Sequence, residues 1–193
     1  MTEPLTKWEE LLDPTITQEK LISASLYIAA FEILKDSICG RIKTFYSIGF
    51  DESGSITDTK YATEVLSRHS RPLQASLAWL TEHEAIDAAD TQTFARINAV
   101  RNHLAHNLQT VIFGESPSEH IALFQDLIAL LRKIETWWVV NVEIPTNPDY
   151  DGQEIDESGI VPGPVLMLQM MFEVASGNRE LLARYRKMRG SEL

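Results

Sequence analysis

The apolar side chains of residues 21–42 recur at intervals of three and four residues, and this spacing constrains the fold more than any other feature. They are Leu21, Ala24, Ile28, Phe31, Leu34, Ile38 and Ile42. Residues at this spacing lie on one face of an α-helix, so the pattern predicts a long amphipathic helix. The start signals are Asp13-Pro14 and Thr17, and the Gly49/Gly54 region ends it. We therefore expect a helix over Thr17–Tyr46.

Helical periodicity continues through most of the chain, with no convincing strand pattern, and segment 51–58 is expected to be a polar loop. Further helices are expected over residues 59–69, 72–84, 91–108, 116–140, 165–175 and 179–188. Thr91 is the expected N-cap of the third of these, and Ser116–Glu119 form a capping box with Pro117 at the first helical position. The sequence therefore predicts an all-α fold, an antiparallel helical bundle with additional C-terminal helices.

The composition changes at Pro145. Residues 145–164 contain four prolines, three glycines and five carboxylates, with no basic residue. This composition predicts an irregular acidic loop. We therefore divide the chain into a lead-in (1–16), a helical domain (17–144), the acidic loop (145–164) and a C-terminal helical appendage (165–193).

The last expected helix is strongly basic. Its cations are Arg179, Arg184, Arg186, Lys187 and Arg189. Such a helix can bind an RNA backbone, or pair with the acidic loop of its own or a neighbouring chain, or be a solvated face. The sequence leaves these alternatives open.

Charge and cysteine content narrow the possible classes. The net charge of −11 argues against a general nucleic-acid coating protein, although it allows an enzyme that meets RNA at a small basic site. The single cysteine, Cys39, excludes an intramolecular disulfide. The longest apolar stretch, Leu21–Leu34, is interrupted by Glu32 and is too short to span a bilayer. With no signal-peptide pattern at the N-terminus, we expect a cytoplasmic protein without a membrane partner.

Segment 101–107 concentrates the side chains that carry chemistry; it reads Arg101-Asn102-His103-Leu104-Ala105-His106-Asn107. Arginine presents a planar fork of donors that suits phosphate, and histidine exchanges protons near neutral pH. On an ideal helix Arg101 and His106 lie about 140° apart. One copy of the motif is therefore a poor active site, whereas a two-fold axis would bring two copies to one cleft.

Other interpretations of these residues remain open. Arg101 is compatible with a surface salt bridge, and His106 with a helix histidine of no chemical role. A metal pair of His103 and His106 is not supported, because neither a Cys nor a carboxylate cluster lies at ligand spacing. Trp137-Trp138 is expected in the core or in a dimer interface rather than stacked on bases. His69, His83 and His120, near expected helix ends, are expected to be solvated.

The segment RNHLAHN, on the fourth helix of an all-helical chain, resembles the HEPN superfamily. The signature of that superfamily is an Arg, a polar residue directly after it, and a His four to six residues further on; here these are Arg101, Asn102 and His106. The stretches SLYIAAFEILKDSICGRIKTFY and FARINAVRNHLAHN look most like its abortive-infection branch. The resemblance covers roughly residues 17–140 and implies a HEPN-like bundle.

The resemblance implies a homodimer and, in many members, a metal-independent endoribonuclease of a toxin or phage-defence type. On this basis Arg101, Asn102 and His106 are expected to be catalytic, and His103 and Asn107 to bind substrate, with no cofactor or metal. The implied partners are RNA, a second copy and a possible protein antitoxin or regulator. In one toxin branch a Tyr that the antitoxin modifies follows two residues after the His; here that residue is Leu108. The alternative is a non-catalytic HEPN-like dimeric binding module.

Overall fold

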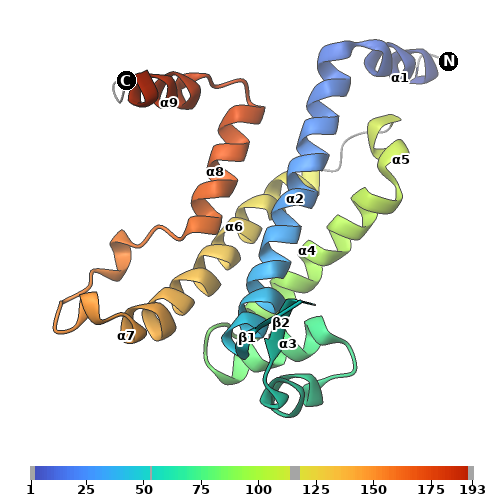
Figure 1. Cartoon of the computed structure of the whole chain (residues 1–193). Helices are drawn as coiled ribbons and strands as arrows, with labels where there is room; N and C mark the ends of the chain where they lie inside the picture. The colour runs from blue at the N-terminus through green and yellow to red at the C-terminus, as the bar shows by residue number, and fades with distance from the viewer. Residues whose placement is uncertain (1–2, 53, 114–117, 191–193) are drawn as a thin grey trace.

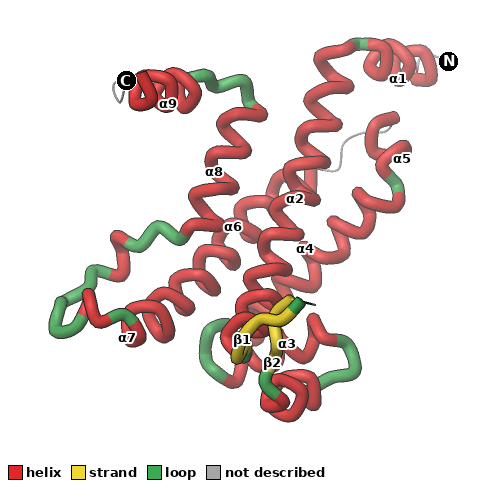
Figure 2. The backbone as a smooth tube through the Cα atoms, in the orientation of Figure 1, coloured by secondary structure: helices red, strands yellow, loops and turns green. Residues whose placement is uncertain are grey.

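The fold is all-α, as the periodicity predicts. The structure, a computed structural model, describes residues 3–52, 54–113 and 118–190, and 79% of it is helical (Figure 2). The helices are α1 Glu3–Leu12, α2 Pro14–Phe45, α3 Pro72–Glu82, α4 Ala88–His106, α5 Leu108–Phe113, α6 Ser118–Trp138, α7 Ile144–Thr146, α8 Gly163–Ala175 and α9 Glu180–Gly190. The strands are β1 Ser47–Asp51 and β2 Gly54–Thr57.

Four of these helices, α2, α4, α6 and α8, run alternately down and up through the molecule (Figure 1). Helices α2, α4 and α6 all contact one another, and α8 packs against α2 and α6. Figure 1 shows α2 and α6 between α4 and α8, so those two helices lie on opposite sides of the molecule. Helix α9 extends away from the top of α8.

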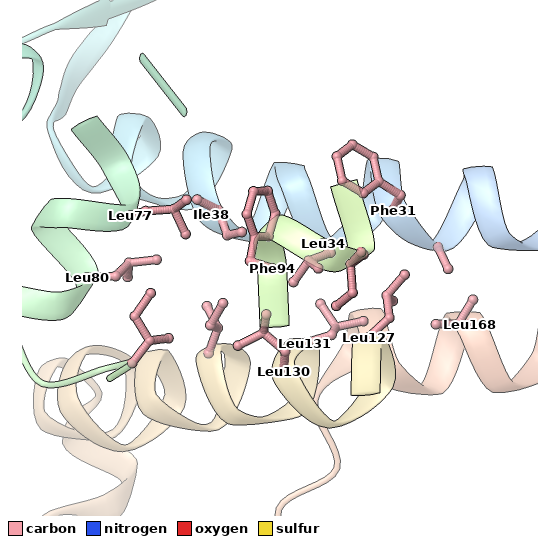
Figure 3. Packing of buried hydrophobic residues seen from close by; sticks show 14 of the residues in the cluster. Phe31, Leu34, Ile38, Leu77, Leu80, Phe94, Leu127, Leu130, Leu131 and Leu168 are labelled. Carbon is pink, nitrogen blue, oxygen red and sulfur yellow. The ribbon is translucent and has the colours of Figure 1, made fainter. Parts of the chain in front are cut away.

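The core lies where α2, α4 and α6 face one another. Phe31 of α2 and Phe94 of α4 stack with ring centroids 6.0 Å apart, and both are buried. Leu127 and Leu131 of α6 close this core from the other side (Figure 3). Trp138, which stacks on Trp79 of α3 at 5.9 Å, is also buried, which confirms the core placement expected for this tryptophan.

The N-cap of helix α4 lies four residues before the predicted one. It is Asp87, whose side chain accepts hydrogen bonds from the backbone N–H groups of Ala89 and Asp90. In turn, the side chain of Asp90 accepts a hydrogen bond from the backbone N–H of Asp87. The prediction of Thr91 as N-cap was wrong, because this carboxylate pair forms the reciprocal capping box. Lys133 of α6 bridges both carboxylates and ties the start of α4 to α6.

A two-stranded antiparallel hairpin, β1–β2, occupies residues 47–57, where the sequence predicted the end of a helix and a loop. The prediction of a loop at 51–58 and of no strands was therefore wrong. The strands have only five and four residues, which is the short end of the range over which a period-two pattern identifies a strand. Their large apolar side chains, Ile48 and Phe50 among them, are exposed, so the strands have no buried face that an apolar pattern could indicate.

Three further segments refine the predicted boundaries. Residues 59–68 are helical, with Tyr61–Val65 as a π-helix and Leu66–Arg68 as a 3-10 helix, whereas His69, the last residue of the predicted helix, is extended. The lead-in is ordered as α1, and the boundary at residue 17 falls inside α2, which Asp13 caps. The acidic loop is irregular apart from α7 and 3-10 turns at Pro148–Tyr150 and Glu157–Gly159. The predicted capping box at 116–119 includes residues outside the described ranges.

Candidate functional site

The motif lies in the last two turns of α4, which stays α-helical to His106. Asn107 ends the helix, and its backbone N–H donates to the carbonyl of His103 at 2.9 Å. Because the helix is continuous between Arg101 and His106, these side chains leave it about 140° apart, as the sequence predicts. One chain therefore carries them on different faces of α4.

Arg101 is held by three neighbours. Its Nη2 donates to Glu32 Oε1 of α2 at 2.5 Å and its Nη1 donates to Asn102 Oδ1 at 3.2 Å. Its guanidinium carbon lies 5.2 Å from the ring centroid of Phe31, a cation–π contact. The side chain is 27% exposed, and its Nε is buried without a hydrogen-bond partner among the described residues. The guanidinium is thus fixed at the α2–α4 surface with donor capacity to spare.

Glu32, the ion-pair partner of Arg101, was not predicted as a site residue from the sequence. Burial acts to raise the pKa of its carboxyl, but the hydrogen bonds from Lys35 and Arg101 outweigh it and lower the pKa below the ordinary 4.5. The stability that the ion pair contributes is therefore fully present above the ordinary pKa of the carboxyl. It is lost as the pH falls through the lowered pKa of Glu32 in the folded protein. Glu32 stands among apolar residues of the long helix. An acid at such a position indicates a cationic partner on a neighbouring helix.

His106 differs from Arg101 in its surroundings. It is exposed at the end of α4, and within the described ranges it makes no hydrogen bond, ion pair or ring contact. His103 and Asn107, also exposed, are 3.4 Å apart between Nδ1 and Nδ2. The five predicted residues thus fall into three groups: Arg101 with Asn102, His103 with Asn107, and His106 by itself. Arg101 therefore contributes to the contact between α2 and α4, whereas His106 makes no such contact within the described ranges.

A hollow of about 540 Å³ lies beside Glu32, between α2, the end of α6 and the start of α8. Arg41 lines it, and its Nη2 contacts Glu135 at 2.9 Å and Glu143 at 2.6 Å. Glu135 is 1% exposed, so its charge depends on Arg41. Four of the five charged side chains in this lining are carboxylates, and the hollow is therefore a poor site for an anion.

One histidine prediction was wrong. His120 of α6 is 3% exposed, and its Nε2 lies 2.8 Å from the hydroxyl of Ser23 on α2. It packs edge-on against Tyr27 and lines an open groove of about 990 Å³ between α2, α6 and α8. The sequence could not show this burial, because Ser23 is distant along the chain. His69 and His83 are exposed, as predicted.

The described residues include no group of three or more His, Cys, Asp or Glu side chains that could hold a metal ion. Compared with protein-family models, with curated proteins and with solved structures, the chain matches none of them.

Proposed function

We propose that this protein is a HEPN-like, metal-independent endoribonuclease whose active site forms where two copies bring their α4 helices together. The observation that carries the proposal is the contrast within the motif. Arg101 is fixed at the surface by Glu32, Asn102 and Phe31, whereas His106 is exposed and makes no hydrogen bond, ion pair or ring contact with any described residue. A fixed cation can stabilise the charge that develops during phosphodiester cleavage, and an available imidazole can transfer the protons.

The proposed reaction uses the 2′-hydroxyl of RNA as its nucleophile. His106 removes the 2′-hydroxyl proton as the oxygen attacks the phosphorus. Arg101 stabilises the negative charge that develops on the phosphoryl oxygens. The bond from phosphorus to the 5′-oxygen breaks and a protonated His106 donates a proton to this oxygen, which leaves a 2′,3′-cyclic phosphate and a 5′-hydroxyl. Asn102 orients the Arg101 fork, and the exposed pair His103 and Asn107 contacts the RNA beside it.

A two-fold contact between two copies would bring together the Arg101 and His106 side chains that a single chain carries on different faces of α4. Arg101 of one copy and His106 of the other would face the same phosphate if the axis passes close to the end of α4. Such an isologous contact presents the same side chains twice. The toxin or phage-defence setting and a protein antitoxin rest on the family resemblance alone, and the proposed cytoplasmic location rests on the sequence pattern of the N-terminus.

The second candidate is a dimeric binding module without catalysis. The satisfied Glu32–Arg101 ion pair favours it, since a paired arginine has less need of a phosphate. Digestion of RNA by the purified protein, with and without EDTA, distinguishes the two candidates. We expect cleavage that EDTA does not abolish. A strict need for magnesium would contradict the proposed mechanism, and absence of cleavage across structured and unstructured RNAs would leave the binding module.

Replacing Glu32 by glutamine is expected to strengthen RNA binding at low salt by about twofold to fivefold. The amide keeps an acceptor for Arg101 but removes the negative charge that competes with phosphate, and a part-exposed ion pair is worth about 1 kcal/mol or less. The gain should shrink as salt screens the charge. Fluorescence anisotropy with a labelled RNA oligonucleotide measures both effects.

Asp36→Asn is the matched control, because it removes the same charge one turn further along α2 and makes no ion pair within the described chain. Equal gains in RNA affinity for the Glu32 and Asp36 variants would show that the effect comes from the overall charge of the protein and not from the contact with Arg101. Weaker binding by Glu32→Gln would show that the carboxylate serves the site by holding Arg101 rather than by competing with RNA.

A further inference from the structure

Helix α8 has apolar residues on two opposite faces. Val165 and Leu168 are buried against the bundle formed by α2 and α6. The opposite face is exposed and consists of Leu166, Met167, Met170 and Val174, which are 38–62% exposed. At 100° per residue these four side chains span about 100° of the helix surface. A helix that is apolar on both sides is usually covered on both sides, so this outer face of α8 indicates a contact surface.

Oppositely charged segments flank α8. The acidic loop precedes it, with Asp149, Asp151, Glu154, Asp156 and Glu157, and the basic α9 follows it. Figure 1 shows both on the side of α8 that faces away from α2 and α4. Within the described ranges no ion pair joins them, and the cations of α9 make one ion pair, Arg184 with Glu180 of the same helix at 3.7 Å. Both charged segments are therefore available to another molecule.

We propose that the outer face of α8 binds the same face of a second copy, antiparallel, around a two-fold axis near Met170. Antiparallel pairing sets the acidic loop of each copy beside the basic α9 of the other, whereas parallel pairing would set like charges together. The 13 residues of α8 hold the two segments of one chain about 20 Å apart. That separation exceeds the Debye length of about 8 Å, so the charges attract a second chain more than each other.

A bilayer fits this face less well. Residues Glu157–Ala175 are apolar enough to cross a membrane by length and composition, but the α-helix within them begins at Gly163. Its length of about 20 Å is short of the hydrocarbon core of about 30 Å. Anionic lipids would also repel the acidic loop directly before it.

This contact is separate from the one that the proposed ribonuclease requires, because α2 and α6 lie between α8 and the motif on α4 (Figure 1). If both contacts form around two-fold axes that intersect at right angles, the protein is a tetramer. If only the α8 contact forms, the protein is a dimer. Loss of the α8 contact halves the mass in either case, so its failure is distinguishable from failure of the ribonuclease proposal.

Sedimentation equilibrium of the full chain at micromolar concentration tests the contact. Met170→Lys places a charge at the proposed axis and is expected to halve the mass. Gln169→Lys is the matched control, since it adds the same charge to an exposed position of α8 outside the outer face, and should leave the mass unchanged. A monomeric wild type, or equal masses for the two variants, would overturn the proposal.

Cysteine cross-linking tests the direction of pairing, in a Cys39→Ser background that removes the only native thiol. Positions 166 and 174 are equally far from 170, so antiparallel pairing places each beside the other in the second copy. A mixture of Leu166→Cys and Val174→Cys chains should form the disulfide-linked pair under mild oxidation, and each variant alone should form far less. Cross-linking of each variant with itself but not in the mixture would indicate parallel pairing and contradict the proposal.

Charge reversal and vesicles separate a second copy from a lipid surface. Arg186→Glu with Arg189→Glu should weaken self-association, and adding Asp151→Lys with Asp156→Lys to the same chain should restore it. Vesicles of phosphatidylcholine and phosphatidylserine serve as the alternative partner. Failure of the added lysines to restore self-association would contradict the charge pairing. A lipid partner would be indicated if Met170→Lys abolishes vesicle binding but leaves the mass of the protein unchanged, and this result would also contradict the proposal.

Discussion

Replacing His106 by alanine is expected to lower the rate of RNA cleavage by about 100-fold or more, the scale for removal of a general acid–base group. Arg101→Ala is expected to cost a similar factor, because one charge donor at a developing oxyanion contributes about 100-fold to 1,000-fold. Single-turnover cleavage of a labelled RNA, with analysis of the product ends, measures both rates. The wild type should leave a 2′,3′-cyclic phosphate.

The same helix offers a control. Arg96 is exposed on α4, five residues before Arg101, and makes no hydrogen bond or ion pair within the described ranges. Arg96→Ala removes an equal charge and should retain most of the activity. Wild-type rates in both His106→Ala and Arg101→Ala would remove the motif from the mechanism. Equal losses in Arg96→Ala and Arg101→Ala would indicate that Arg101 acts only through overall charge.

Replacing Phe94 by alanine is expected to lower the free energy of unfolding by about 3–5 kcal/mol, the range for deletion of a buried phenylalanine. Phe94 is 1% exposed and stacks on Phe31, so the deletion leaves a cavity between α2 and α4. Because Phe31 also lies under Arg101, this packing supports the site as well as the fold. Urea unfolding monitored by circular dichroism measures the change.

Phe50→Ala is the matched control for this loss. It deletes the same side chain at a position of β1 that is 82% exposed. The free energy of unfolding should change by about 0.5 kcal/mol or less, as is usual for surface substitutions. Similar losses in the two variants would contradict the placement of the core between α2, α4 and α6.

The long helices were predictable because each buries one face, which fixes the spacing of its apolar residues. Phe31, Leu34 and Ile38 follow this rule, and all three lie in the core. The hairpin was not predictable, because its short strands expose Ile48 and Phe50 rather than burying a face. The cap of α4 was misplaced because Asp87 and Asp90 use an acidic pair in place of the commoner Ser/Thr and Glu.

The site was predictable only within α4. The spacing of Arg101 and His106 and the helix that carries them came from local sequence, and so did their separation around that helix. Glu32, the partner of Arg101, lies on another helix, 69 residues away. The burial of His120 likewise depends on Ser23, which is 97 residues away. Contacts of this kind depend on how the helices pack, which periodicity along one helix does not report.

The most direct test of the central claim is to mix two inactive chains, Arg101→Ala and His106→Ala. If each active site combines Arg101 of one copy with His106 of the other, a mixed dimer retains one intact site. Random exchange then makes about half of the dimers mixed, which restores about a quarter of wild-type activity. We predict this recovery, measured as RNA cleavage after the chains have exchanged. No recovery, with mixed dimers demonstrated by mass, would contradict a shared site.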